Sequence, residues 1–365
     1  MSFIEKIALT KIKGIGPKLS RQLLAYFGSV ENLFSCPEKE LRAVPGISHQ
    51  LIQHIRCSAT FKAAEQEANL IAQHQIQAIW FEDEAYPNRL RHCEDAPLLL
   101  YSYGHMNFNG PKMVSIVGTR NATYYGKKIV DELLAGLKEI GAYVVSGLAL
   151  GIDILAHQAC IKQEVPNVAV LGHGLGTIYP DSNRRYVGDI MANGSLLTEF
   201  NYRALPEKCN FPMRNRIIAG MSDVTVVVEA GNKGGALITA SYANDYNRDV
   251  CAYPGGIDQP YSAGCNQLIK DNQAHLIRHA EDLIELMSWQ NRTAASPKAV
   301  QLSLIPSMNS EQLAVYQYLR DHGETGIDSL AAHLDWPASK MAATLLEMEL
   351  QGLLHALPGK TYKNL

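Results

Sequence analysis

Arginine and glycine residues that could bind a polyanion are concentrated in residues 211–240, FPMRNRIIAGMSDVTVVVEAGNKGGALITA. Arg214 and Arg216 can each fork two hydrogen bonds onto phosphate oxygens. A turn containing Gly234 and Gly235 then opens a helix, whose first backbone N–H groups lack intrahelical partners and favour an anion. This order predicts a polyanion site, although an ordinary strand-to-helix turn with a nearby cation is an alternative for a single such segment.

Short β-branched runs alternate with amphipathic segments between residues 80 and 290. Alternation of this kind predicts an α/β fold with a parallel, doubly wound sheet, in which ligands bind beyond the carboxyl ends of the strands. The sequence predicts buried strands at 113–117, 143–145, 168–171, 195–198, 224–228 and 250–252, and helices near 127–137, 152–161, 185–191, 215–221 and 237–246.

Small residues follow the expected strand ends and leave the backbone open to a ligand. Gly118, Thr119 and Arg120 follow the first of these strands, and Ser146 and Gly147 follow the second. Dinucleotide binding would need GxGxxG after the first strand and an acidic residue at the end of the second, and triphosphate hydrolysis would need GxxxxGK[ST]. The sequence contains none of these patterns, so we expect no nucleotide cofactor.

The composition is that of a globular protein, with 47% hydrophobic and 19% charged residues among 365, and it predicts two or three domains. Seven cysteines without a CxxC pair favour reduced thiols and suggest no metal site. The sequence shows no leader peptide and no apolar run of membrane-spanning length, so we expect a cytoplasmic protein with no membrane partner. The net charge of -3 means that nucleic-acid binding would need a local basic patch.

Composition zones predict the domain organisation: a helical domain at 1–75, a sheet domain at 76–290, a linker at 291–310 and a winged-helix domain at 311–365. The helix at 338–349 would be the one to enter a DNA groove, but it carries one lysine against two glutamates, which favours a protein-contact role.

The first domain contains glycine hairpins typical of helix-hairpin-helix motifs. Gly14 and Gly16, followed by Lys18 and Arg21, could present amides and cations to a phosphate. The same residues could equally form a plain connection between two packed helices.

Six ordered motifs across the middle domain resemble the DNA-processing protein A (DprA, also called Smf) family. The resemblance implies an extended Rossmann-like domain that binds single-stranded DNA, forms a homodimer and loads the RecA recombinase onto incoming strands during natural transformation. It also covers the two flanking modules, which are similar to those of longer family members. The motifs are GTR at 118–120, SGLALGIDILAH at 146–157, LGHGLGTIYP at 171–180, FPMRNRIIAGMSD at 211–223, GGALITA at 234–240 and GCNQLIKDNQA at 264–274.

By this resemblance, Arg120 grips a phosphate with support from the arginines of RNR, and Phe211 stacks on a base. The residues alone leave two alternatives open: Phe211 as a hydrophobic staple, and Arg216 as a structural partner of Glu199 or Glu229. Three arginine contacts would give a log–log salt slope of about -2.

The expected DNA-binding residues are Gly118, Thr119, Arg120, Ser146, Gly147, Phe211, Arg214, Asn215, Arg216, Lys233, Gly234, Gly235 and Thr239. The homodimer interface, carried over from the family, is expected to include Leu268 and Ile269.

A phosphoribohydrolase-like enzyme is the alternative function, because that class has a similar sheet and glycine turns. Its PGGxGTxxE segment places a carboxylate beside the sugar, whereas residues 234–239 here read GGALIT and contain no acid. Asp153 and His157 lie four residues apart, but two ligands do not make a metal site, and we expect them to be structural. No catalytic or metal-ligating residue is therefore assigned, and a binding protein is favoured over an enzyme.

Overall fold

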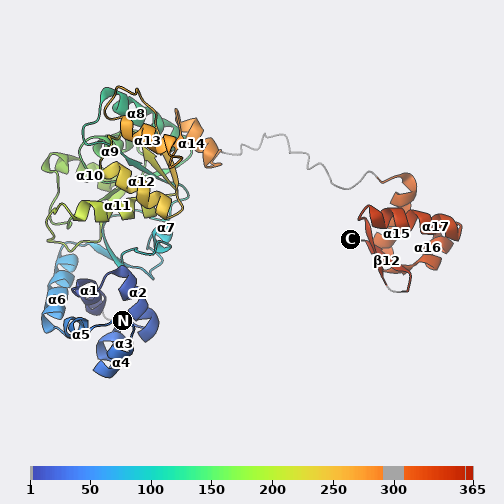
Figure 1. Cartoon of the computed structure of the whole chain (residues 1–365), viewed down its shortest axis with the longest axis horizontal. Helices are drawn as coiled ribbons and strands as arrows, with labels where there is room; N and C mark the ends of the chain where they lie inside the picture. The colour runs from blue at the N-terminus through green and yellow to red at the C-terminus, as the bar shows by residue number, and fades with distance from the viewer. Residues whose placement is uncertain (1–2, 291–307, 358, 365) are drawn as a thin grey trace. The chain divides into compact units, whose positions relative to one another are not determined.

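The computed structural model describes residues 3–290, 308–357 and 359–364, which belong to two units (Figure 1). The first unit contains Met1–Asn291 and the second contains Arg292–Leu365. The expected linker at 291–310 lies almost entirely outside the described residues. No helix within the described ranges is long and apolar enough to cross a bilayer.

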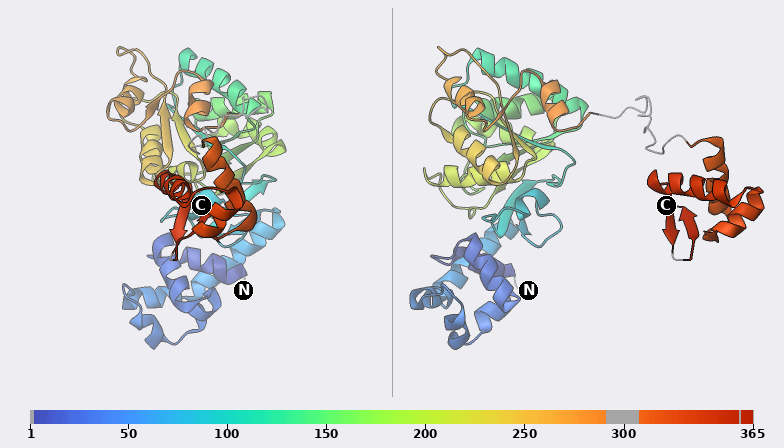
Figure 2. Two further views of the ribbon diagram at one scale, coloured as in Figure 1. Left: turned by 90° about the vertical axis from the view of Figure 1, so that its right-hand side faces the viewer. Right: turned by 45° about the vertical axis from the view of Figure 1, so that its right-hand side comes forward.

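A module of six helices begins the first unit: α1 (Phe3–Lys11), α2 (Pro17–Phe27), α3 (Val30–Ser35), α4 (Glu38–Ala43), α5 (His49–Ile55) and α6 (Ser58–Gln73). α2 starts with Pro17, at a position where the missing N–H costs nothing, and ends at Gly28 in the left-handed conformation. The apolar faces of these helices share one core with Trp80, Leu99 and Tyr101 of the first two strands. The helical module and the sheet are thus joined by a common hydrophobic core. The ribbon diagram shows the helices next to this end of the sheet (Figure 2).

The cations of the first glycine hairpin face the sheet domain. Lys18 pairs with Glu94, and Arg21 Nη1 donates to the carbonyl of Cys93 at 3.0 Å. These contacts favour the packing role for the hairpin that the sequence left open.

Nine strands form one sheet in the order β1-β2-β6-β5-β4-β3-β7-β8-β9. The seven strands from β3 to β9 run parallel, while β2 is antiparallel to both β1 and β6, so the sheet is mixed. The strands are β1 (Gln77–Trp80), β2 (Leu99–Gly104), β3 (Met113–Val117), β4 (Tyr143–Ser146), β5 (Asn167–Val170), β6 (Gly194–Thr198), β7 (Val224–Val227), β8 (Asp249–Ala252) and β9 (His275–Leu276).

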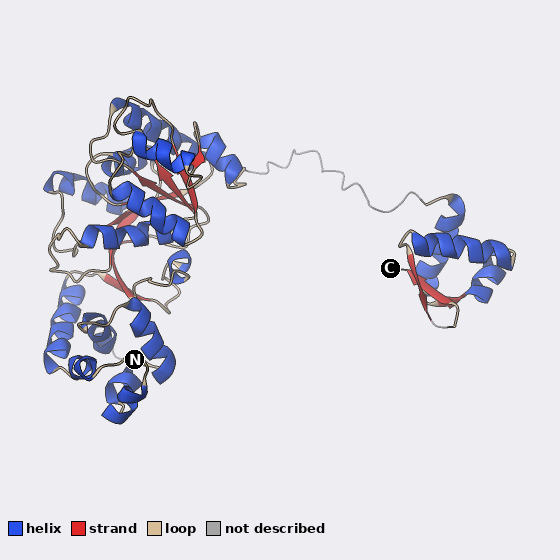
Figure 3. Cartoon of the chain, viewed as in Figure 1, coloured by secondary structure: helices blue, strands red, loops and turns tan. Residues whose placement is uncertain are grey.

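Helices cover both faces of this sheet, and the predicted doubly wound architecture is confirmed (Figure 3). One face packs against α7 (Asn88–Arg91), α11 (Asn210–Gly220), α12 (Gly235–Asp245) and α13 (Ala263–Lys270). The other face packs against α8 (Tyr124–Glu139), α9 (Ile152–Gln163) and α14 (Ala280–Leu286). The 3-10 helix η1 (Asp181–Tyr186) and α10 (Val187–Ala192) lead into β6.

The second unit, taken by itself, is a winged helix, as the sequence predicts. A small core that includes Val315, Leu330 and Leu345 holds it together. Lys340, the one cation of α17, lies 4.5 Å from the ring of Trp336 and 2.7 Å from Glu311, so it is already engaged. The elements are α15 (Ser310–His322), β10 (Thr325–Gly326), α16 (Ile327–Leu334), α17 (Ala338–Leu350), β11 (Leu354–Leu357) and β12 (Thr361–Asn364), with the strands in the order β10-β12-β11.

Candidate nucleic-acid interface

A cleft of about 690 Å³ lies beyond the carboxyl ends of β3 and β7. From β3 the chain builds β4 to β6 on one side of the sheet and then returns to place β7 to β9 on the other side. Loops that leave neighbouring strands at such a reversal diverge and open a crevice, which is where doubly wound sheets bind ligands. The cleft is lined by the loops after both strands and by α11 and α12.

The glycine turn opens one side of the cleft to a ligand. A Cβ added at Gly234 would meet nothing within 4 Å, and one added at Gly235 would come only within 3.6 Å of Asn215 Nδ2. Because these two positions carry no side chain, the first N–H groups of α12 stay accessible to a ligand in the cleft. Asn215 Nδ2 and Thr239 Oγ1 both donate to the carbonyl of Gly235, at 3.0 and 3.1 Å, and so hold this turn in place.

Arg120 is an exposed cation at the mouth of the cleft, and its Cζ lies 5.7 Å from the centre of the Phe211 ring. The backbone before it is fixed, because the N–H of Thr119 donates to the carbonyl of Glu229 at 2.7 Å. Gly151 has a φ of +78°, and a side chain there would clash with the backbone of Thr119 and Arg120. The fold thus places Arg120 by a close backbone approach that only glycine allows.

Arg214 lines the cleft but is buried, with 4% of its surface exposed. Its guanidinium donates to the carbonyls of Gly147 and Val170, at the ends of β4 and β5. Burial lowers the pKa of Arg214 to about 10, and the opposing charge of Asp153 counteracts this shift. Arg214 therefore ties two strand ends together at the floor of the cleft, beside the buried carboxyl group of Asp153.

Arg216 does not reach the cleft, and its expected phosphate contact is corrected. Its guanidinium pairs with Glu199 and lies 3.6 Å from a carboxylate oxygen of Asp95. Two residues apart on a helix project in nearly opposite directions, so Arg214 and Arg216 cannot share one ligand. The alternative that the sequence left open, a structural pair with Glu199, is the one that the structure shows.

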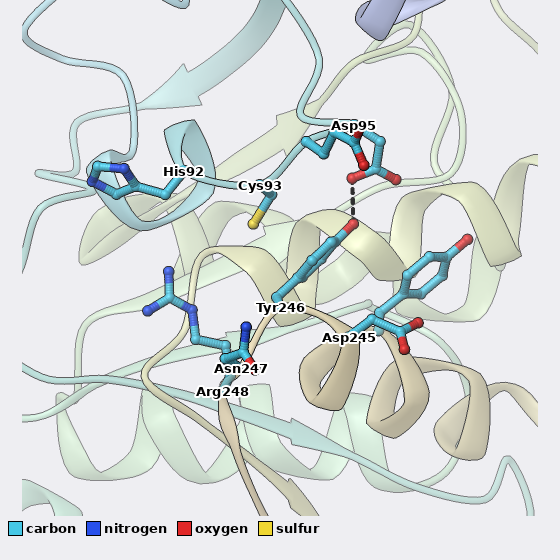
Figure 4. Close-up of a pocket in the computed structure, with 9 residues that line it drawn as sticks. His92, Cys93, Asp95, Asp245, Tyr246, Asn247 and Arg248 are labelled. Carbon is cyan, nitrogen blue, oxygen red and sulfur yellow. Dashed lines mark hydrogen bonds between the residues drawn. The ribbon is translucent and has the colours of Figure 1, made fainter.

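A separate pocket of about 430 Å³ lies between the 92–95 segment and the end of α12 (Figure 4). The hydroxyl of Tyr246 donates there to Asp95, whose backbone carbonyl accepts from Arg216. Burial raises the pKa of Cys93 to about 11, which keeps it a neutral thiol near pH 7. The polar groups of this pocket thus support the Arg216 network.

The remaining expected residues fall into two groups. Gly118, Thr119 and Lys233 line the cleft, and Phe211 stands at its edge. Ser146 is fully buried and donates to the carbonyl of Ile116 at 2.7 Å, so it is corrected to a structural residue. Gly147 is buried as well, and a side chain there would come within 2.7 Å of the Arg214 guanidinium carbon.

Sequence reasoning did not assign three residues that also line the cleft: Tyr179, Lys208 and Tyr261. They come from loops after β5, β6 and β8, and the fold brings them together. The signal available in the sequence was the basic Lys208 three residues before Phe211, and the Tyr179-Pro180 pair at the end of a family motif.

Asp153 and His157 have structural surroundings, as expected. His157 is fully buried, and its Nδ1 lies 2.7 Å from Asn167 Oδ1. Burial lowers the pKa of His157 to about 4, so the imidazole is neutral. Asp153 is buried beside Arg214, and burial raises its pKa.

Leu268 lies in the core that α13 forms with the sheet, with 6% of its surface exposed, and Ile269 is half-buried against the same core. The expectation that Leu268 offers a contact to a second copy is therefore corrected. The exposed apolar residue nearby in the sequence is Leu276 of the edge strand β9, at 48%.

The fold and the cleft define a Rossmann-like protein with flanking helix-hairpin-helix and winged-helix modules. The family model for DNA recombination-mediator protein A matches residues 77–288, a SAM-like helix-hairpin-helix tandem matches 6–57, and a DprA winged-helix domain matches 293–360. The chain belongs to the DNA recombination-mediator protein A family, so the resemblance found in the sequence is confirmed.

Individual relatives agree with this assignment. The protein Smf of Synechocystis is 32% identical over 98% of this chain and 97% of its own length. The solved structure of DNA processing protein A from Streptococcus pneumoniae is 30% identical, with a TM-score of 0.64 over 78% of this chain and 98% of that one. The Helicobacter pylori protein, whose structure addresses its single-stranded DNA binding mode, is also 30% identical, with a TM-score of 0.53 over 59% of this chain and 96% of that one.

Proposed function

We propose that this chain binds single-stranded DNA in the cleft beyond β3 and β7. The observation that carries the proposal is the convergence of three exposed cations, Arg120, Lys208 and Lys233, with the N-terminus of α12 on one cleft. Cations and helix N-termini are the groups that bind phosphates. The single-stranded DNA binding of the Helicobacter pylori relative supports this reading.

Each part of the cleft has a role in this proposal. Arg120, Lys208 and Lys233 contact successive phosphates, while buried Arg214 holds the cleft floor beneath them. Aromatic rings at the edge of the cleft contact bases, which a single strand presents unpaired. Because contacts to phosphates and ring faces carry little sequence information, binding is sequence-tolerant.

The cleft residues support binding over sugar cleavage. The acid that lines the cleft is Asp153, and its buried carboxylate faces Arg214 and the amides of Gly147 and Ala149. An acid held in this way stabilises the cleft floor, so we propose no catalytic role for it.

The experiment that tests the function is a titration of the full chain with fluorescent oligothymidine and with a duplex of equal length. We expect tighter binding of the single strand and a log–log salt slope of about -2, from three cations at roughly 0.7 each. Equal affinity for the two DNAs, or a slope near zero, would contradict the proposal.

We further propose that the chain forms a homodimer and loads the RecA recombinase onto single-stranded DNA during natural transformation. Membership in a recombination-mediator family supports this role. The sheet offers a site for pairing, because β9 is an edge strand and its Leu276 is 48% exposed. An edge strand carries backbone groups that a second copy could pair with.

The dimer and mediator roles are tested together. The chain should sediment as a dimer and should speed RecA assembly on oligothymidine coated with single-strand-binding protein. A Leu276→Asp variant should sediment as a monomer and lose this stimulation while binding oligothymidine normally. Tyr26→Asp, at an exposed residue of α2, should change neither. A monomeric native chain, or unchanged RecA assembly, would exclude these roles and leave DNA binding standing.

A further inference from the structure

The ring of Phe211 is half-buried and has three close neighbours. The guanidinium of Arg120 lies over its ring, with Cζ 5.7 Å from the ring centre. Gly172 lies against the ring as well, because a Cβ added there would come within 2.8 Å of Phe211 Cδ1. The ring of Tyr179 is the third neighbour, with its centre 5.8 Å away and its plane tilted by 39°. Phe211 is thus half-buried among these neighbours and carries Arg120 over its ring.

The exposed aromatic surface at this edge belongs to Tyr179. Its exposed fraction is 46%, and Leu150 next to it is also 46% exposed. Both residues line a narrow slot together with Pro180 and Phe211, and the slot shares Arg120, Tyr179 and Phe211 with the cleft. The apolar surface is therefore continuous with the region where we place the phosphates.

The backbone of Tyr179 is held by a buried histidine. His173 is 1% exposed, its Nδ1 lies 3.0 Å from the carbonyl of Gly174, and its Nε2 accepts from the N–H of Tyr179 at 3.3 Å. Burial lowers the pKa of His173, which keeps the imidazole neutral and able to accept this hydrogen bond. Thr198 Oγ1 donates to the carbonyl of His173 at 2.8 Å. The ring thus projects from a fixed turn.

We propose that Tyr179 is a base-stacking residue of this protein. One nucleobase of the bound strand lies on the exposed ring of Tyr179, beside Leu150 and Pro180, while the adjoining phosphate meets Arg120. The ring centres of Tyr179 and Phe211 are 5.8 Å apart, and the guanidinium of Arg120 lies over Phe211. One nucleotide can therefore reach both Tyr179 and Arg120. This inference rests on the proposed single-stranded DNA binding.

The test compares two ligands of equal charge, oligothymidine and an abasic oligonucleotide of the same length. Tyr179→Ala should weaken binding of oligothymidine about 5- to 150-fold, the range for loss of stacking on one base. It should leave affinity for the abasic strand and the salt slope unchanged, because both depend on phosphates. Tyr179→Phe should bind as the native chain does. Tyr103→Ala, at a residue 42% exposed on β2, is the matched control and should have no effect.

The possible outcomes separate this inference from the proposed function. If the native chain binds neither ligand, the proposed function fails, and the role of Tyr179 fails with it. If the native chain binds and Tyr179→Ala keeps full preference for oligothymidine over the abasic strand, the stacking role alone is wrong. Equal loss on both ligands would also overturn it, because that result would indicate damage to the cleft.

Discussion

An Arg120→Ala variant should bind oligothymidine about 10- to 100-fold more weakly than the native chain, the range for loss of one charged hydrogen-bonded contact. Its log–log salt slope should become less steep by roughly 0.7, because one phosphate contact is lost. Arg120 lies at the mouth of the cleft on a backbone that Thr119 and Gly151 hold in place. Titration by fluorescence anisotropy at four or five salt concentrations measures both quantities.

A matched control comes from Lys128, an exposed cation on α8 that pairs with Glu132 and is not part of the cleft lining. Lys128→Ala removes the same formal charge, so it should leave the affinity within about twofold and the slope unchanged. Equal behaviour of the two variants would show that only overall charge matters, and unchanged binding by Arg120→Ala would remove that residue from the site.

Glu199→Ala should lower the free energy of unfolding by about 3 to 5 kcal/mol, the cost of leaving a buried charge without its partner. Glu199 and Arg216 have side chains that are 11% and 7% exposed, and the nearest second acid, Asp95, is 41% exposed and also accepts from Tyr246. Asp95 therefore cannot fully replace Glu199. Denaturation by urea, followed by circular dichroism, measures the change.

The double variant Glu199→Leu with Arg216→Met should be less destabilised than Glu199→Ala, because it leaves no unpaired charge in the protein interior. An exposed pair provides the control: Glu38 and Arg42 lie one helical turn apart with half or more of each side chain exposed, and Glu38→Ala should cost no more than about 0.5 kcal/mol. A small effect of Glu199→Ala would mean that water or Asp95 compensates for the lost carboxylate.

The strands that sequence patterns found are the interior ones. β3 to β8 are almost wholly buried and therefore appear as short runs rich in apolar and β-branched residues. β1 and β2 were missed because they pair in antiparallel fashion at one edge of the sheet and share their apolar residues with the helical module. β9 has two residues, too few to produce a pattern.

The sequence predicted those cleft residues that follow a strand directly. Strand-end glycines and Arg120 are visible in the sequence because each follows its own strand directly. Arg216 was misplaced because Glu199, its partner, is 17 positions away and meets it only through the fold. Lys208 lies three residues before Phe211 and could have been assigned from the sequence, whereas Tyr179 comes from a separate loop that only the fold brings to Phe211.

The core that Trp80, Leu99 and Tyr101 share with the six N-terminal helices makes those helices and the rest of the first unit cooperative partners in folding. Part of the buried surface of each is provided by the other, so we expect the two to melt in one common transition. A ligand that bound and stabilised the helices would therefore also stabilise the sheet edge. A substitution that destabilised that edge would in turn destabilise the helices.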